Sequence, residues 1–141
     1  MEKLALRKAL QDFIEPTDRK CCLLSVRPIY VNRIVEGSKR YEYRKKCFSR
    51  EVSKVFIYSS HPIQKIVGCF LVSQIIYDSP QYIWGLTKDS AGIDLDSFES
   101  YSKGRSHIFA IRVENFNAFT VPINPYELVK NFVPPQSYMY I

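Results

Sequence analysis

The chain has 141 residues, of which 46% are hydrophobic, 24% charged and 14% aromatic. This length and composition are typical of one globular domain with its own core, and they exclude disordered and collagen-like chains. The longest apolar run, IVGCFLV at 66–72, has the length of a strand and is too short to span a membrane. The N-terminus carries charges and no apolar signal core, so we expect a soluble, cytoplasmic protein with no membrane partner.

The positive charge is concentrated in the first part of the chain. Twenty Lys and Arg against 14 Asp and Glu give a net charge of +6. Residues 1–60 contain 14 basic and 7 acidic side chains, whereas residues 61–141 contain 6 and 7. The densest basic stretch runs from 39 to 50 and is interrupted only by Glu42. A one-sided basic surface is typical of proteins that bind a phosphate-bearing partner, although a solvated surface would show the same pattern.

The cysteines show no spacing typical of a metal site. The chain has no C-x-x-C pair and only two histidines, so we expect neither a zinc site nor disulfides. Cys21, Cys22 and Cys69 lie in apolar runs, where a reduced cysteine packs as a small hydrophobic side chain. There is also no P-loop, dinucleotide-binding or HExxH motif, so no cofactor and no metal are expected.

The first elements are a helix, a strand and a second helix. Apolar side chains at helical spacing predict an amphipathic helix over 2–14. It could pack on its own domain or form a docking face for a partner protein. An apolar run predicts a buried strand over 21–26, and the next helix begins at Pro28 and ends at Gly37, which favours a left-handed cap.

Strands then dominate the pattern. The segment RYEYR at 40–44 alternates charged and tyrosine side chains, so Glu42 and Arg44 would lie side by side on one face of a strand. This order favours an α+β fold in which a small mixed β-barrel is flanked by short helices, with an open α+β sheet as the alternative. We expect one domain, with a helical segment at 1–20 and the barrel at 21–141. Further strands are predicted over 53–59, 65–77 (with a bulge or bend at Gly68) and 106–116, short helices over 80–88 and 94–102, and turns with a terminal edge strand after 122.

The most concentrated functional candidate is GSKRYEYR at 37–44. Lys39 precedes the strand and could reach the same pocket as Glu42 and Arg44. A lysine, a carboxylate and an arginine around one pocket can bind a phosphate or a ribose and could move a proton. The alternative is an exposed ladder of ion pairs, which would contribute little to stability.

Three other features suit a nucleic acid ligand. Arg27 lies where a strand ends and a helix begins, and helix N-termini attract phosphate groups. Ser59 and Ser60 would form a polar loop at a pocket rim. Trp84 could stack on a base, and Arg105 could assist a second aromatic surface. The alternatives are an ordinary strand–helix connection at Arg27 and a core position for the Trp84 ring.

Several motifs follow one another along the chain: LSVRP at 24–28, the string G-x-K-x-x-E-x-R at 37–44, IVG at 66–68 and PPQSY at 134–138. With these motifs, the chain resembles the ASCH (activating-signal-cointegrator homology) family of the PUA-like superfamily over residues 22–140. The resemblance implies a β-barrel with a cleft between barrel and helices. The cleft would bind RNA or a modified nucleotide, with a role in RNA metabolism or transcription regulation.

The resemblance also implies a place for each candidate residue. Lys39, Glu42 and Arg44 would line the cleft, and the basic stretch would bind phosphates outside it. The expected partner is RNA or a modified nucleotide, with single-stranded DNA as an alternative. The residues expected to contact the nucleic acid are Arg27, Lys39, Glu42, Arg44, Lys45, Lys46, Ser59, Ser60, Trp84 and Arg105.

Two enzymatic branches have a similar fold and imply an alternative function, hydrolysis of RNA or of modified nucleosides. One hydrolyses N4-acetylcytidine with a Lys-x-x-Thr-x-Arg string and a Glu on a later strand. Here Lys39 and Arg44 match, but Glu42 occupies the Thr position and 66–77 contains no Glu. The other branch cuts single-stranded RNA. In that reaction Glu42 would be the base, and Lys39 and Arg44 would stabilise the pentavalent phosphate, so these three would be the catalytic residues.

Overall fold

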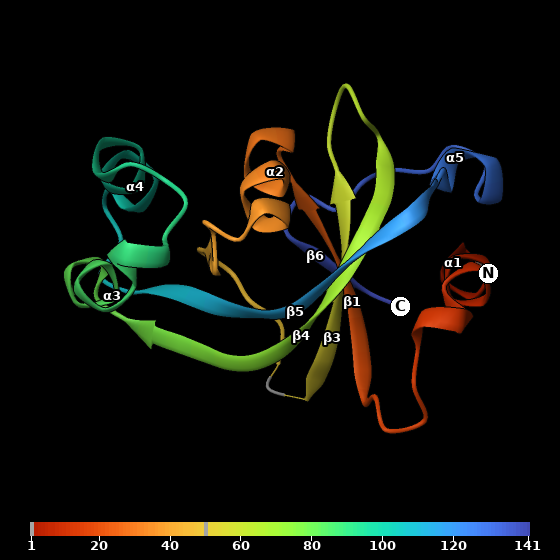
Figure 1. Cartoon of the computed structure of the whole chain (residues 1–141), viewed down its shortest axis with the longest axis horizontal. Coiled ribbons are helices and arrows are strands. Elements are labelled where there is room, and N and C mark those ends of the chain that lie inside the picture. The colour runs from red at the N-terminus through yellow and green to blue at the C-terminus, as the bar shows by residue number, and fades with distance from the viewer. Residues whose placement is uncertain (1, 50) are drawn as a thin grey trace.

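The computed structural model describes residues 2–49 and 51–141, so Arg50 of the predicted basic stretch lies outside the described residues. The fold contains one mixed sheet and several short helices (Figure 1). No helix in the described part of the chain is long and apolar enough to cross a membrane. In chain order the elements are α1 (Glu2–Ala9), η1 (a 3-10 turn, Gln11–Phe13), β1 (Lys20–Val26), α2 (Pro28–Glu36), β2 (Tyr41–Arg44), β3 (Val52–Ser59), β4 (Lys65–Asp78), α3 (Pro80–Thr87), η2 (a 3-10 turn, Lys88–Ser90), α4 (Leu95–Ser102), β5 (Ile108–Ile123), α5 (Pro125–Leu128) and β6 (Tyr138–Tyr140).

The sheet has six strands in the order β2-β5-β4-β3-β1-β6 and curves into a half-barrel. β4 and β5 pair antiparallel with three register shifts, and such shifts bend and twist a sheet. One of them lies next to Gly68, where an added Cβ would lie 2.5 Å from the carbonyl oxygen of Asn117. Only glycine therefore allows the two strands to approach here. The predicted α+β class, the barrel-like mixed sheet and the irregularity at Gly68 are confirmed.

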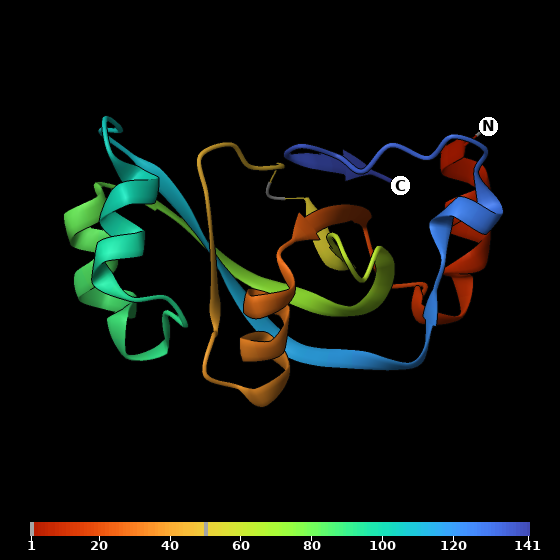
Figure 2. The same ribbon diagram turned by 90° about the horizontal axis from the view of Figure 1, so that it is seen from above.

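The long β4–β5 ribbon connects the two ends of the molecule (Figures 1 and 2). α3 and α4 lie at one end, α1 and α5 lie at the other, and α2 lies between them. β1 pairs in parallel with β3 on one side and antiparallel with β6 on the other. The end of β1, the start of α2 and the C-terminal segment therefore meet in one place.

The N-terminal helix packs on the chain's own core. Leu6 and Leu10 are buried in one cluster with Leu23 and Phe56 of the sheet. The helix is interrupted after Ala9, and η1 continues the segment that was predicted as one helix over 2–14. The apolar face that could have served a partner protein is therefore occupied by the sheet of this chain.

The helices α2, α3 and α4 are fixed by two further clusters. Val31 and Ile34 of α2 are buried in the first, together with side chains of β1, β3, β4 and β5. In the second, Phe98 of α4 packs edge-on against Tyr43 of β2, with 5.0 Å between ring centroids. This packing sets the distance between β2 and the α3–α4 pair.

The C-terminal third departs most from the prediction. β5 continues to Ile123, beyond the strand predicted over 106–116, because Asn115 lies at an irregular position within the ladder, with φ +48°, and pairing resumes at Asn117 opposite Cys69. A short helix, α5, replaces one of the predicted turns and is capped by Asn124, whose side chain accepts the Tyr126 N–H. The predicted terminal edge strand is confirmed as β6.

The four cysteines are free and pack as apolar side chains. Cys21, Cys22 and Cys69 are buried, and Cys47 is half-buried. Burial disfavours the thiolate. It raises the pKa of Cys22 to about 12 and the pKa values of Cys47 and Cys69 to about 11.

A buried ion pair joins the N-terminal segment to β3. Lys54 Nζ lies 2.8 Å from Asp18 Oδ2 and donates to the Phe13 carbonyl at 2.5 Å. The Glu15 N–H and the Ser53 hydroxyl donate to the same carboxylate. Burial alone would raise the pKa of Asp18, but the hydrogen bonds from Lys54 and from the Glu15 N–H outweigh it, and the pKa falls below its ordinary value of 3.8.

We expect Asp18→Asn to lower the free energy of unfolding by about 2 kcal/mol at neutral pH, because it leaves the Lys54 ammonium buried without a counter-charge. The pKa of Asp18 is lower in the folded chain than in the unfolded chain. Its contribution is therefore complete above about pH 4 and is lost as the pH falls through the lowered value. Urea unfolding from about pH 7 to about pH 3 measures both effects, with Asp12→Asn at an exposed position as the control. A stability difference that stays constant over this range would contradict the assignment.

Candidate functional site

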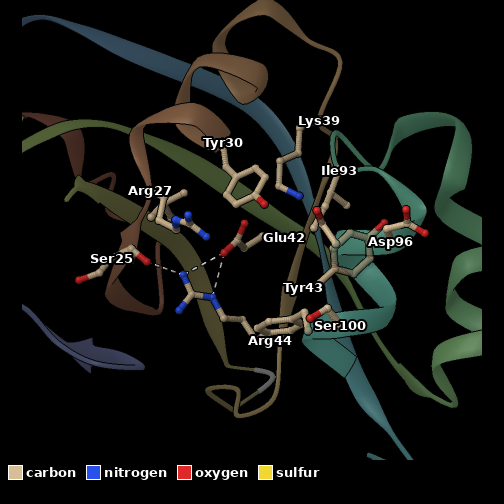
Figure 3. Close-up of a pocket in the computed structure, with 13 residues that line it drawn as sticks. Ser25, Arg27, Tyr30, Lys39, Glu42, Tyr43, Arg44, Ile93, Asp96 and Ser100 are labelled. Atoms are coloured by element: carbon tan, nitrogen blue, oxygen red, sulfur yellow. Dashed lines mark hydrogen bonds and ion pairs between the residues drawn. The ribbon is translucent and has the colours of Figure 1, made fainter. Parts of the chain in front are cut away.

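A cleft of about 670 Å³ opens between the β1–α2 turn, β2 and α4 (Figure 3). Strand β2 supplies its charged floor, because alternate residues of a strand share one face. The helix α2 supplies Tyr30 on one side, and α4 supplies Asp96 and Ser100 on the other. Lys39 enters from the loop that connects α2 to β2.

Glu42 and Arg44 form an ion pair on the cleft face of β2, as the alternation predicted. Nε and Nη2 of Arg44 each lie 2.9 Å from Glu42 Oε2. Nη2 also donates to the carbonyl of Ser25 at 2.6 Å, and Nη1 donates to that of Ser137 at 3.2 Å. One N–H each on Nε, Nη1 and Nη2 is thus engaged in a hydrogen bond, which leaves two of the five donors of the guanidinium. Arg44 therefore positions Glu42 and ties β1 and the C-terminal segment to β2.

The second carboxylate oxygen of Glu42 faces the cleft. The residue is only 7% exposed, so its carboxylate has few water contacts. No side chain among residues 2–49 and 51–141 donates to Oε1, which points into the space beside Tyr30 and Lys39 (Figure 3). An ionised carboxylate oxygen can accept two hydrogen bonds. The cleft thus presents a fixed acceptor with unused capacity.

Lys39 places a buried ammonium next to this acceptor. The residue is 3% exposed, and its Nζ donates to the Ala91 carbonyl at 2.8 Å. Nζ also lies 5.3 Å from the ring centre of Tyr30 and 4.8 Å from that of Tyr43, in cation–π geometry. Burial lowers the pKa of Lys39, and the charge of Glu42 partly offsets this. Only one of the three ammonium donors is used by the Ala91 carbonyl.

The loop before α4 fixes the position of Lys39. Lys39 and Ala91 form an isolated antiparallel bridge, and Gly92 packs directly on Lys39 with φ +63°. A Cβ at position 92 would overlap the Lys39 side chain and lie 2.8 Å from its Cα. Arg33 of α2 donates to the Gly92 carbonyl at 2.8 Å. These contacts join α2, Lys39 and the loop before α4.

Arg27 lies at the rim of the cleft, where α2 begins. Its side chain is exposed, and its guanidinium lies 5.8 Å from the ring centre of Tyr30. Within the described part of the chain it forms no ion pair. Arg27 is therefore a cation with free donors at this rim, beside the N-terminus of a helix.

Other predicted residues lie outside the lining of the cleft. Ser59 is 2% exposed on β3, and Ser60 donates its N–H to the carbonyl at the end of β1, so both lie behind the β1–α2 turn. Lys45 and Lys46 are exposed and follow β2 directly. Lys45 packs over the ring of Tyr101, which itself lines the cleft, at 4.7 Å from the ring centre. The two lysines thus lie beyond the floor of the cleft.

Trp84 and Arg105 are brought together, but away from the cleft. Both line a separate groove between α3 and α4. The Trp84 ring packs on Phe98, with ring centroids 4.8 Å apart. The sequence indicated residue types suited to stacking. It did not indicate that Trp84 and Arg105 lie apart from the cleft, because this depends on which face of α4 packs against α3.

The sequence analysis missed the wall formed by α4. Asp96, Ser97 and Ser100 lie on one face of this helix and line the cleft. Their helical spacing was visible in the sequence, but nothing there indicated which element the polar face would meet. Asp96 and Glu42 are the two carboxylates of the cleft. In the part of the chain that the structure describes, no three His, Cys, Asp or Glu side chains are grouped to hold a metal ion.

Comparisons with known proteins agree with this architecture. Residues 23–134 match the family described as a domain of unknown function, DUF365. A curated Zymomonas mobilis protein named ASCH domain-containing ribonuclease is 25% identical over 128 residues, which cover 88% of this chain and 86% of that protein. The crystal structure of ASCH from Z. mobilis matches with a TM-score of 0.80 and 25% identity, over 88% of this chain and 89% of that chain. The N-terminal domain of Staphylothermus marinus McrB has a related fold, with a TM-score of 0.50 and 13% identity over 80% of each chain.

We expect Gly92→Ala to lower the free energy of unfolding by about 1–3 kcal/mol, because the new Cβ overlaps Lys39 at a backbone conformation that favours glycine. Gly85→Ala is a matched control inside α3, where an added Cβ meets nothing within 4 Å. It should stabilise the chain by about 0.5–1 kcal/mol. Urea unfolding compares the two variants. A change of the same sign in both would contradict the close packing between Gly92 and Lys39.

Proposed function

Because the chain belongs to the DUF365 family and has the sequence motifs and fold of the ASCH domain proteins, we propose that it binds RNA in the cleft between α2, β2 and α4. The observation that carries this proposal is the pairing of a fixed carboxylate with a buried ammonium in one cleft. Glu42 offers a free acceptor oxygen, and Lys39 offers donors beside it. The volume of about 670 Å³ falls in the range of small-ligand sites and is sufficient for a nucleotide.

Each side chain of the cleft has a role in this proposal. Glu42 accepts a hydrogen bond from a base N–H, and Tyr30 supplies an aromatic ring beside the base. Lys39 binds phosphate or ribose from within the cleft, and Arg27 does so at the rim. Base edges are accessible in unpaired RNA, so the ligand is a single strand or a flipped nucleotide.

The name of the Z. mobilis relative supports RNA as the polymer. Outside the cleft, Lys45 and Lys46 bind backbone phosphates and make the affinity depend on salt. Single-stranded DNA of the matching sequence shares the phosphates and, apart from thymine in place of uracil, the bases, and it lacks the 2′-hydroxyl. A comparison of the two polymers measures how far the cleft reads the ribose.

A second candidate function is RNA cleavage, which the ribonuclease name of the relative favours. The same groups suit this reaction. Glu42 would take the proton from the attacking 2′-hydroxyl as its oxygen bonds to phosphorus, the P–O5′ bond would break, and the leaving 5′-oxygen would take a proton from water. Lys39 would stabilise the negative charge on the phosphate oxygens together with Arg27, which takes the place of the predicted Arg44 because three donors of Arg44 are used within the chain. Binding and cleavage therefore share one site and differ in whether the RNA is recovered unchanged.

We expect Glu42→Gln to weaken binding of a short single-stranded RNA about 10- to 100-fold and to change the preferred base, because an acceptor with full charge becomes a neutral amide. Fluorescence anisotropy measures the affinity, and electrophoresis of the same samples shows whether the RNA is cut. RNA that is retained intact supports binding alone, and products that disappear in the variant support cleavage.

Glu114→Gln is the matched control. Glu114 also pairs with an arginine two residues away on a strand, Arg112, at 3.3 Å, and it lies outside the cleft lining. Its loss should leave RNA binding unchanged. Equal effects of Glu42→Gln and Glu114→Gln would argue against the cleft as the binding site.

Removing the charges of Lys45 and Lys46 together should weaken binding to a similar extent for all sequences. The slope of log affinity against log salt concentration should become shallower by roughly 1.4, at about 0.7 for each lost phosphate contact on a single strand. The double variant Lys3→Ala/Lys8→Ala removes the same charge on α1, at the end of the molecule opposite α3 and α4. If both double variants had the same slope, Lys45 and Lys46 would not contact the RNA.

A further inference from the structure

A second hollow, the α3–α4 groove, has a volume of about 490 Å³. It is lined from α4 by Leu95, Phe98, Glu99 and Ser102, which are spaced along one helical face. The α4 residues that line the cleft fall between them in sequence, so they project from the opposite face of the helix. One helix thus separates two concave surfaces.

The groove combines an aromatic ring with cations. Trp84 is half-buried, with its ring supported by Phe98 at 4.8 Å between centroids. Lys103 and Arg105 are exposed at the rim and form no ion pair with any described residue. Glu99 and Gln81 add polar groups to the same lining. An aromatic surface with an adjacent arginine is the arrangement that binds successive bases of single strands.

The position of Arg105 is set by the turn that ends α4. Gly104 adopts φ +79°, and the Arg105 N–H donates to the Ser102 carbonyl at 3.0 Å. On the cleft side of the same helix end, Lys45 packs on Tyr101 and donates its N–H to the Tyr101 hydroxyl. Cations therefore surround the C-terminal end of α4 between the cleft and the groove.

We propose that the α3–α4 groove is a second nucleotide subsite, in which a base of the RNA strand bound in the cleft stacks on Trp84 while Arg105 binds a backbone phosphate. This inference rests on the proposed RNA binding in the cleft. A helix with its side chains is about 10–12 Å across, which roughly three nucleotides span at about 3.4 Å each. The strand passes around the end of α4, where Lys45 and Lys103 lie. The cations favour RNA over a peptide as the occupant.

Trp84 is the only tryptophan of the chain, so its fluorescence reports on this groove alone. A dinucleotide fills only the cleft and should leave the emission unchanged. A single-stranded RNA of about eight nucleotides should bind about 10-fold more tightly than the dinucleotide and quench Trp84, because base–aromatic stacking adds to the affinity. Arg105→Glu should abolish both the additional affinity and the quenching, with no effect on the dinucleotide.

Arg19→Glu is the control for the charge change, because Arg19 is exposed next to β1 and lines neither of the two hollows. Trp84→Leu keeps an apolar contact with Phe98 and should lose the length-dependent affinity while unfolding at a similar urea concentration. If the longer RNA binds more tightly but leaves the Trp84 emission and the Arg105→Glu affinity unchanged, the subsite is wrong and the cleft proposal stands. If neither RNA binds, both proposals fail. An emission that responds to a pool of peptides and not to RNA would identify a peptide groove instead.

Discussion

The guanidinium of Arg44 joins three segments that are far apart in the sequence. It contacts the carbonyl of Ser25 at the end of β1, the carboxylate of Glu42 on its own strand and the carbonyl of Ser137 in the C-terminal segment. Without it, the buried Glu42 carboxylate would lose its ion-pair partner and the donor to Oε2, which is costly in a protein interior. The planar, forked geometry of arginine suits this task, since a lysine could not direct donors at three acceptors in one plane. The free oxygen of Glu42 keeps its direction because the other oxygen is bound.

The three cations of the cleft differ in how many of their hydrogen-bond donors are already used within the chain. Arg44 uses most of its donors inside the chain, Lys39 uses one, and Arg27 remains open at the rim. Burial lowers the pKa of Lys39, and the nearby carboxylate favours its charged form, so the two buried groups depend on each other. A ligand with a negative group and a hydrogen-bond donor complements this arrangement. A purely anionic or purely cationic ligand would meet repulsion from one of the two buried charges.

Much of the fold and the chemical core of the site could be predicted from the sequence. The alternation in RYEYR placed Glu42 and Arg44 side by side, and Gly37 ended α2 as expected, with φ +92°. The carbonyl partners of Arg44, at Ser25 and Ser137, could not be predicted, because backbone carbonyls leave no trace in the residue pattern. Trp84 and Arg105 were predicted as residue types suited to stacking, which stays a prediction, and the groove that they share is created by the packing of α3 on α4. Tertiary contacts of this kind depend on which helix face is buried, and short helices leave that choice open.

The hydrogen bond from Arg33 to the Gly92 carbonyl has a consequence for how the cleft meets its ligand. Together with the Lys39–Ala91 bridge it fastens α2 to the loop before α4. The two walls of the cleft cannot separate unless these bonds break, so the width of the opening is fixed before any ligand arrives. A cleft of fixed width admits a planar ring only if the ring fits that width. Because the walls are already ordered, the protein loses little conformational entropy when such a ring binds. Selectivity by size then comes from the framework itself and adds to the selectivity of the hydrogen bonds inside.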